Sequence, residues 1–211
     1  PGPVVRTSEH GLETWPVAGR TMALVIHDGP NPKWTRRILD ALREYGAHAT
    51  FMLVGKRVNE NPELVRRMLA EGHDVGITGL RPGDITQLPG WQRELELSLA
   101  QQALASAAGV HTRLFGQQGP VADTTLLRMG LDGYLVVNAS ENAQTLPWGD
   151  LAALSAMAER GVVIRMHDTG SITVDEVHGL LSTMTTRGHR FSSISEGLVM
   201  QTGLIHGTGM A

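Results

Sequence analysis

The sequence predicts an α/β fold, a distorted barrel of about seven parallel strands surrounded by helices, and two observations lead to it. First, short apolar runs of strand length alternate with longer segments whose apolar residues recur at helical spacing. Such alternation is typical of a parallel sheet covered by helices. Second, the strand–helix unit recurs often enough, without an internal sequence repeat, to close or nearly close a barrel.

The strands are expected where short runs of apolar and β-branched residues are bounded by polar residues or glycine. In chain order these runs are residues 22–26, 49–54, 73–77, 113–115, 134–138, 162–166 and 191–194. Their lengths are ordinary for the strands of a barrel.

The helices are expected in the segments between these strands, at residues 34–45, 62–71, 88–108, 123–129, 151–160 and 174–187. In the first of them, Ile38, Leu39 and Leu42 share one face. Pro62 stands in the first turn of the second, where its missing N–H costs nothing. Gly109 is a typical end for the third.

A single domain is expected, because 211 residues suit one sizeable core. Residues 1–20 are expected to be an extended N-terminal lead-in, residues 21–198 the barrel domain and residues 199–211 a loose tail. A net charge of −3 gives no reason to expect nucleic acid or a membrane surface as partner. No apolar run approaches the roughly 20 residues that span a bilayer. The absence of cysteine excludes disulfides, thiolate metal sites and cysteine nucleophiles.

Two of the expected strands end in a histidine followed by an aspartate. The run at residues 22–26 leads into His27 and Asp28, and the run at residues 162–166 leads into His167. Because the carboxyl ends of parallel strands meet at one rim, where active sites are built, we expect these side chains to lie close together. His27, Asp28 and His167 are therefore the candidate catalytic residues.

The stretch Leu-Val-Ile-His-Asp-Gly-Pro at residues 24–30 resembles the first motif of the polysaccharide deacetylase family (carbohydrate esterase family four), which reads Thr-Phe-Asp-Asp-Gly-Pro. Other segments that resemble the family are residues 46–51, 54–55, 62–65, 71–76, 88–92, 133–137 and 167–168. The resemblance runs from about residue 21 to residue 198. It implies a distorted barrel of parallel strands ringed by helices.

The resemblance also implies a chemistry. The family's enzymes remove acetyl groups from N-acetylated sugars with a divalent metal held by one aspartate and two histidines. The metal polarises the amide carbonyl and supplies the water. The first aspartate of the pair acts as base and a late histidine acts as acid. In this sequence the metal aspartate corresponds to Asp28, the base position is His27, and the late histidine is His167.

Four of the family's motifs differ here at the residues that carry the chemistry. Thr78 and Pro82 stand where the two metal histidines are expected, and neither replaces an imidazole. The arginine that orients the base is missing from residues 116–119. The acidic fourth motif aligns with Ser140, Asn142 and Thr145, none of which is a carboxylate. The sequence therefore predicts that the usual metal triad is lost and that no cofactor is needed.

One substitution adds a functional group. Arg165 stands two residues before His167, where the family has leucine, so both side chains are expected on one face of the strand, inside the barrel. A half-buried guanidinium needs an anionic partner, and Asp28, Glu141 or a substrate carboxylate or phosphate can supply it. Trp148 is a candidate for stacking on a sugar ring. Arg165, Glu141 and Trp148 are the candidate substrate-binding residues.

The preferred hypothesis is a repurposed, metal-independent acid–base enzyme, of hydrolase, lyase or cyclase type, acting on a small substrate with an acidic group. His27 and His167 form its proton-transfer pair, and Asp28 orients one of them. Two alternatives stay open. One is a catalytically inactive, saccharide-binding pseudoenzyme domain. The other is a deacetylase with a rearranged metal site built from His27, Asp28 and His167.

Overall fold

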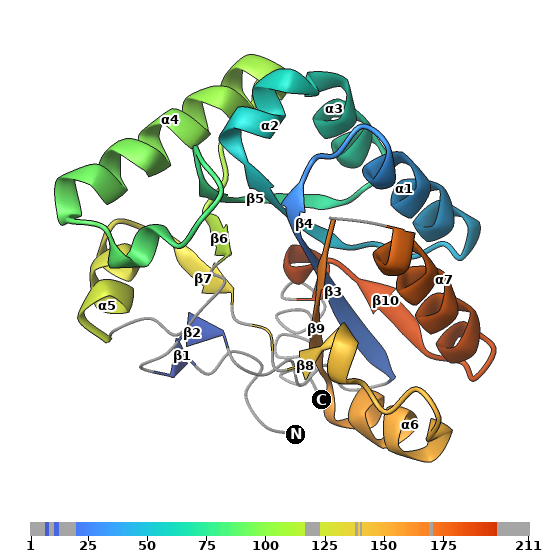
Figure 1. Cartoon of the computed structure of the whole chain (residues 1–211). Coiled ribbons are helices and arrows are strands. Elements are labelled where there is room, and N and C mark those ends of the chain that lie inside the picture. The colour runs from blue at the N-terminus through green and yellow to red at the C-terminus, as the bar shows by residue number, and fades with distance from the viewer. Residues whose placement is uncertain are drawn as a thin grey trace, which may run out of the picture.

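The strands of this protein form one curved sheet with helices on its outer side (Figure 1). The structure is a computed structural model that describes residues 7–8, 11–12, 20–116, 123–137, 139, 141–168 and 171–197. The strand order is β1-β2-β7-β6-β5-β4-β3-β9-β8, and β10 pairs with the start of β3. The sheet is a half-barrel, which confirms the predicted fold class.

The strands, in chain order, are β1 Thr7–Ser8, β2 Gly11–Leu12, β3 Thr21–Gly29, β4 Thr50–Val54, β5 Asp74–Gly79, β6 Leu114–Gly116, β7 Leu135–Val137, β8 Glu141–Asn142, β9 Val163–His167 and β10 Arg190–Ser192. All seven expected strands are present, as β3 to β7, β9 and β10. The additional strands β1, β2 and β8 are two residues long each, too short to show an alternating pattern.

The helices are α1 Trp34–Glu44, α2 Gly55–Glu60, α3 Pro62–Ala70, α4 Gly90–Ala108, α5 Asp123–Leu131, α6 Leu151–Arg160 and α7 Ser171–Thr185, with short 3₁₀ turns at Ile85–Gln87 and Ala143–Thr145. All six expected helices are present, and α7 begins three residues earlier than expected. The sequence did not predict α2, whose buried residues are only Gly55 and Val58. None of the described helices is long and apolar enough to cross a membrane.

Two short strands lie within the expected N-terminal lead-in. Strands β1 and β2 pair antiparallel, with Thr7 opposite Leu12, and Leu12 lies opposite Val137 of β7. This part of the chain therefore extends the sheet at the β7 edge, and the division into an extended lead-in at residues 1–20 and a barrel domain stays a prediction. The expected loose tail at residues 199–211 lies outside the described residues.

Strand β3 divides the core into two parts by the ordinary alternation of side chains along a strand. Leu24 and Ile26 are fully buried in the large cluster shared with the helices. Ala23 and Val25 are fully buried in a smaller cluster on the other face, inside the half-barrel. His27 continues the row of Ala23 and Val25, so it enters the same interior at the carboxyl end of the strand.

Candidate active site

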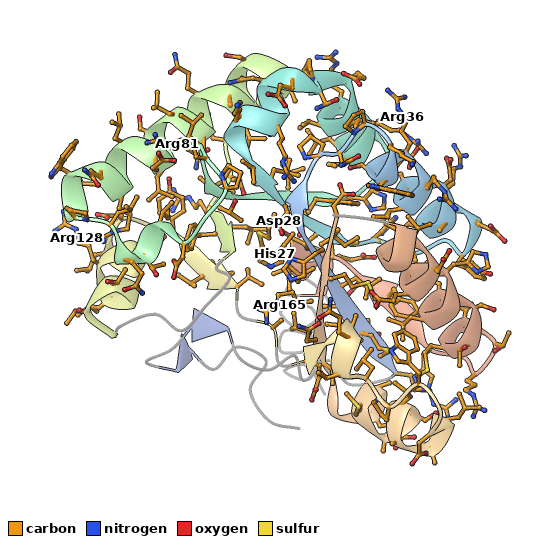
Figure 2. All side chains as sticks on the ribbon, viewed as in Figure 1. His27, Asp28, Arg36, Arg81, Arg128 and Arg165 are labelled. Atoms are coloured by element: carbon orange, nitrogen blue, oxygen red, sulfur yellow. The ribbon has the colours of Figure 1, made fainter. Side chains whose placement is uncertain are left out.

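Strands β3 and β9 are direct neighbours, and their parallel register brings the two histidines together. His27 lies opposite His167, and the ring centroids are 5.9 Å apart at an angle of 46°. Figure 2 shows His27, Asp28 and Arg165 on the concave side of the half-barrel. The structure thus gathers the candidate catalytic residues at one rim.

Asp28 reaches its neighbour strand through an irregular backbone. Its φ of 68° lies in the left-handed region, and the register between β3 and β4 shifts between His27 and Gly29. The Asp28 Oδ2 atom lies 2.8 Å from Nδ1 of His167. Burial alone would raise the pKa of the Asp28 carboxyl, but the hydrogen bond and charge of His167, with charges on His27 and Arg57, lower it. Asp28 is therefore an ionised partner for the His167 ring.

His27 has a very different environment from His167. The residue is 1% exposed, and its Nδ1 has no hydrogen-bond partner among the described residues. Burial, followed by the charge of His167 and more weakly that of Arg165, lowers the pKa of His27 to about 3, against a smaller opposing effect of Asp28. His27 is therefore neutral at neutral pH.

Asp168, which follows His167 directly, is a fully buried carboxyl. Its Oδ2 accepts hydrogen bonds from the Thr35 hydroxyl and, at 3.2 Å, from the Asn31 main-chain N–H. Its own N–H donates to the His27 carbonyl at 2.8 Å. Burial raises the pKa of Asp168 to about 6. These contacts fix the loop that follows β3 against the end of β9.

Arg165 lies on the interior face of β9, one pleat below His167. It is opposite Val25, whose side chain belongs to the interior cluster. In β8, Asn142 is opposite Arg165, whereas Glu141 is opposite Ile164, a residue of the helix-facing cluster. In this register Glu141 and Arg165 point to opposite faces of the sheet, and substrate binding by Glu141 remains a prediction.

Trp148 follows the 3₁₀ turn Ala143–Thr145. Its Nε1 donates to the Ala143 carbonyl at 2.9 Å, and 37% of the residue is exposed. The indole is thus tied to its own turn while one part stays accessible. Stacking of a sugar on Trp148 remains a prediction.

The two positions at which the family has metal histidines lie at the end of β5 and in the loop after it. Thr78 is buried and its hydroxyl donates to the Leu53 carbonyl at 3.2 Å, whereas Pro82 is exposed. Within the described part of the chain, no group of three or more histidine, aspartate or glutamate side chains is arranged to hold a metal ion.

The fourth-motif positions in the described chain are used locally. The Asn142 side chain accepts from the Gln144 N–H at 3.1 Å, and the Thr145 hydroxyl donates to the Asn142 carbonyl at 3.0 Å. Both therefore build the 3₁₀ turn. Ser140 and residues 117–119 lie outside the described residues.

Sequence reasoning missed two charged residues beside the site. Arg57, in α2, donates from Nη1 to the main-chain carbonyl of Asp28. Glu176, in α7, is half-buried; burial raises its pKa, and the charge of His167 lowers it. No motif marks either residue. Only the position of α2 and α7 after strands of the site could have drawn attention to them.

Gly116, the last residue of β6, allows His27 to be buried so deeply. A Cβ at Gly116 would lie 2.5 Å from Met52 Cγ and 2.9 Å from His27 Cε1. Met52 and His27 are both buried, so we expect Gly116→Ala to lower the free energy of unfolding by about 1–3 kcal/mol. Chemical denaturation measures this change.

Gly130→Ala is the matched control for that substitution. Gly130 lies in α5, and a Cβ there has no heavy atom within 4 Å, so we expect stability to rise by about 0.4–1 kcal/mol. If Gly116→Ala were as stable as Gly130→Ala, the interior beside His27 would have to be looser than the contacts indicate.

The chain is similar to characterised deacetylases over most of its length. A family model described as polysaccharide deacetylase matches residues 16–129. A peptidoglycan-N-acetylglucosamine deacetylase of Bacillus cereus is 28% identical over 198 residues, which cover 88% of this chain and 92% of the relative. A chitooligosaccharide deacetylase of Rhizobium leguminosarum bv. trifolii is 30% identical over 154 residues, which cover 71% and 72%. The match to a peptidoglycan-N-acetylmuramic acid deacetylase, PdaC of Bacillus subtilis, covers only 38% of that protein.

Solved structures show the same architecture. The peptidoglycan deacetylase PdaC from Bacillus subtilis superimposes with a TM-score of 0.76 at 26% identity, covering 87% of this chain and 92% of that one. BA3943, a pseudoenzyme of carbohydrate esterase family four from Bacillus anthracis, has a TM-score of 0.72 at 19% identity, covering 87% and 66%, which is a likeness of fold alone. With the family model covering more than half of its residues, the chain belongs to the polysaccharide deacetylase family.

Proposed function

We propose that this chain is a divergent family member that has lost metal-dependent deacetylation and acts as a metal-independent acid–base enzyme on a small substrate with an acidic group. The observation that carries the proposal is the pairing of His167 with Asp28 at the rim, with Nδ1 and Oδ2 2.8 Å apart. A histidine held in this way by a carboxylate is the common arrangement for proton transfer at neutral pH.

The pairing defines what each ring nitrogen can do. With the Nδ1 proton donated to Asp28, the lone pair on Nε2 of His167 takes a proton from the attacking water or from the substrate. The imidazolium that forms is stabilised by the adjacent carboxylate of Asp28. It then returns the proton from Nε2 to the leaving group, so one ring serves as base and as acid.

His27 has a different part in this proposal from the one that the sequence suggested. A ring that is 1% exposed and neutral at neutral pH exchanges no proton with bulk water and carries no charge for a substrate. Its buried Nδ1 instead offers one hydrogen bond inside the barrel. We therefore assign proton transfer to His167 alone, and a neutral, orienting role to His27.

The residues at the family's metal positions support the loss of the metal. Asp28 directs Oδ2 to His167, the Thr78 hydroxyl is bonded to a carbonyl, and Pro82 has no side-chain donor. A divalent metal prefers imidazole and carboxylate ligands, and two of its three expected ligands are absent. The donor set therefore does not fit the family's metal.

Arg165 supports the substrate class. The family acts on saccharides, and the acetyl methyl group of such a substrate would meet an apolar pocket wall. This chain places a guanidinium on the interior face instead, one pleat below His167. A carboxylate or phosphate is the group that a guanidinium binds best, through two parallel hydrogen bonds. The proposed substrate is therefore a small saccharide that carries such a group.

The test combines metal content with activity. We expect purified protein, incubated with zinc and then desalted, to hold zinc well below one equivalent by elemental analysis. N-acetylated oligosaccharides with and without a carboxylate are then offered, and products are followed by mass spectrometry and by acetate release. Conversion of an acidic substrate by metal-free protein is the expected result.

Two other results would overturn the proposal. One equivalent of zinc with zinc-dependent acetate release would identify a deacetylase with a rearranged metal site. Binding of oligosaccharides without any conversion, unchanged by substitution of His167, would identify a saccharide-binding pseudoenzyme.

A further inference from the structure

The main-chain carbonyl of Asp28 receives a hydrogen bond from an unexpected element. Arg57 lies in α2, the short helix that directly follows β4, and its Nη1 donates to the Asp28 oxygen. Strand β4 pairs with β3 up to Gly29, so α2 begins beside the rim that carries Asp28. The half-buried guanidinium therefore lies against the backbone of the candidate site.

This backbone needs support. Asp28 has a φ of 68°, and a residue with a side chain in the left-handed region persists only where surrounding contacts hold it there. This conformation lets the Asp28 carboxylate meet His167 of β9 while its carbonyl points at Arg57. The hydrogen bond from Arg57 is one contact that holds the Asp28 backbone in this conformation.

The charge of Arg57 acts in the same place. It lowers the pKa of Asp28 and also opposes the rise in the pKa of Asp168, so the guanidinium is near both carboxyls. Asp168 in turn donates its N–H to the His27 carbonyl. Arg57 thus lies over the junction between the ends of β3 and β9.

We propose that Arg57 is a positioning residue, which holds Asp28 in the orientation that orders the His167 imidazole. The family's orienting arginine belongs to the third motif, where this chain has no arginine at residues 116–119; here a cation comes from α2 and acts on the other aspartate. The inference rests on the proposed acid–base role of His167 and Asp28. It assigns Arg57 no contact with the substrate.

Helix α2 does not depend on the Arg57 side chain for its own place. The Lys56 N–H donates to the Leu80 carbonyl at 2.8 Å. At Gly55 the backbone packs so closely on α4 that a Cβ would lie 3.0 Å from Ala100 Cα. Removal of the guanidinium should therefore leave α2 in place, and an Arg57 variant should fold.

Proton NMR of the hydrogen bond between His167 and Asp28 tests the inference without any substrate. A Nδ1 proton held against a carboxylate gives a separate downfield signal, which the variant His167→Gln assigns by its loss. We expect this signal in the native chain at neutral pH. In Arg57→Ala it should disappear or broaden at least twofold, and Arg57→Lys or added guanidinium should restore part of it.

Arg66→Ala is the matched control. Arg66, in α3, also donates from Nη1 to a main-chain carbonyl, that of Ala107 at 2.7 Å, but it has no contact with the site. We expect the downfield signal of the His167–Asp28 hydrogen bond in Arg66→Ala to equal that of the native chain. A signal that is unchanged in Arg57→Ala, or lost equally in Arg66→Ala, would overturn the positioning role.

The outcome separates this inference from the proposed function. If an activity is found, Arg57→Ala should lower kcat by about tenfold or more with KM little changed, because Arg57 acts on the ordering of His167 and not on substrate binding. If no activity is found while the signal still depends on Arg57, the positioning role stands and the proposed function falls.

Discussion

As the pH is lowered from 6 to 4, the free energy of unfolding is expected to fall by about 1.4 kcal/mol for each pH unit. The slope is counted from the three buried groups with the largest pKa shifts. Burial lowers the pKa of His27 to about 3 and, with the charge of His48, that of His73 to about 4, while it raises the pKa of Asp168 to about 6. Chemical denaturation at a series of pH values measures the slope.

The sign follows from counting protons in the two states. Near pH 5 the unfolded chain holds a proton on both histidines, whose usual pKa is 6.5, and the folded chain holds none there. Asp168 does the opposite, because the folded carboxyl is protonated below about pH 6 and the unfolded one only below about pH 3.8. The unfolded chain therefore binds about one proton more in total, and stability rises with pH.

Two variants separate these contributions. His73→Asn keeps an acceptor for the Ala49 N–H, which His73 Nδ1 now accepts at 3.3 Å, and removes one titrating histidine, so the profile should become nearly flat. Asp168→Asn removes the opposing carboxyl, and the slope should steepen to about 2.5 kcal/mol per pH unit. A flat native profile would show that one of His27 and His73 is protonated in the folded chain, and a profile that rises toward pH 4 would show that both are.

The sequence predicted the fold well because apolar runs mark buried strands. Every strand expected from such a run is present, and the elements that were missed lack this signal. Strand β8 is two residues long, and in α2 the buried residues are Gly55, which has no side chain, and Val58. Such elements are fixed by tertiary contacts, which a periodic pattern does not record.

The site could be predicted in part for a geometric reason. His27, Asp28 and His167 each follow a buried run, and the ends of parallel strands share one rim. The orientation of Glu141 could not be predicted, because a shift of one residue in the register of β8 reverses the face of every side chain. Arg57 was missed because it binds a main-chain carbonyl, a contact that requires no partner of a particular residue type.

In the proposed mechanism the depth of burial separates the roles of the two histidines, and burial is a tertiary property. The two rings are 5.9 Å apart and stand in equivalent positions at the ends of neighbouring strands, so the sequence suggested a symmetric pair. In the structure 28% of the His167 side chain is exposed, against 1% of His27. Only His167 combines access to a substrate with a carboxylate partner.

Substitution of His167 is therefore expected to have the largest effect on turnover. His167→Gln should lower kcat by about 10²–10⁴-fold, the usual contribution of a positioned acid–base group, because glutamine keeps a polar side chain but transfers no proton. His27→Gln should keep activity within about tenfold, since a neutral amide replaces a neutral imidazole. Steady-state kinetics on the converted substrate, with circular dichroism of each variant, measure both effects.

His178→Ala is the control for loss of an imidazole as such. His178 lies in α7 with its side chain 52% exposed, and its ring contacts Tyr45, outside the site. We expect unchanged kinetics for this variant. Equal losses in His27→Gln and His167→Gln would contradict the asymmetric assignment and favour a symmetric two-histidine shuttle. The difference between the two variants thus tests whether burial excludes His27 from the proposed proton transfer.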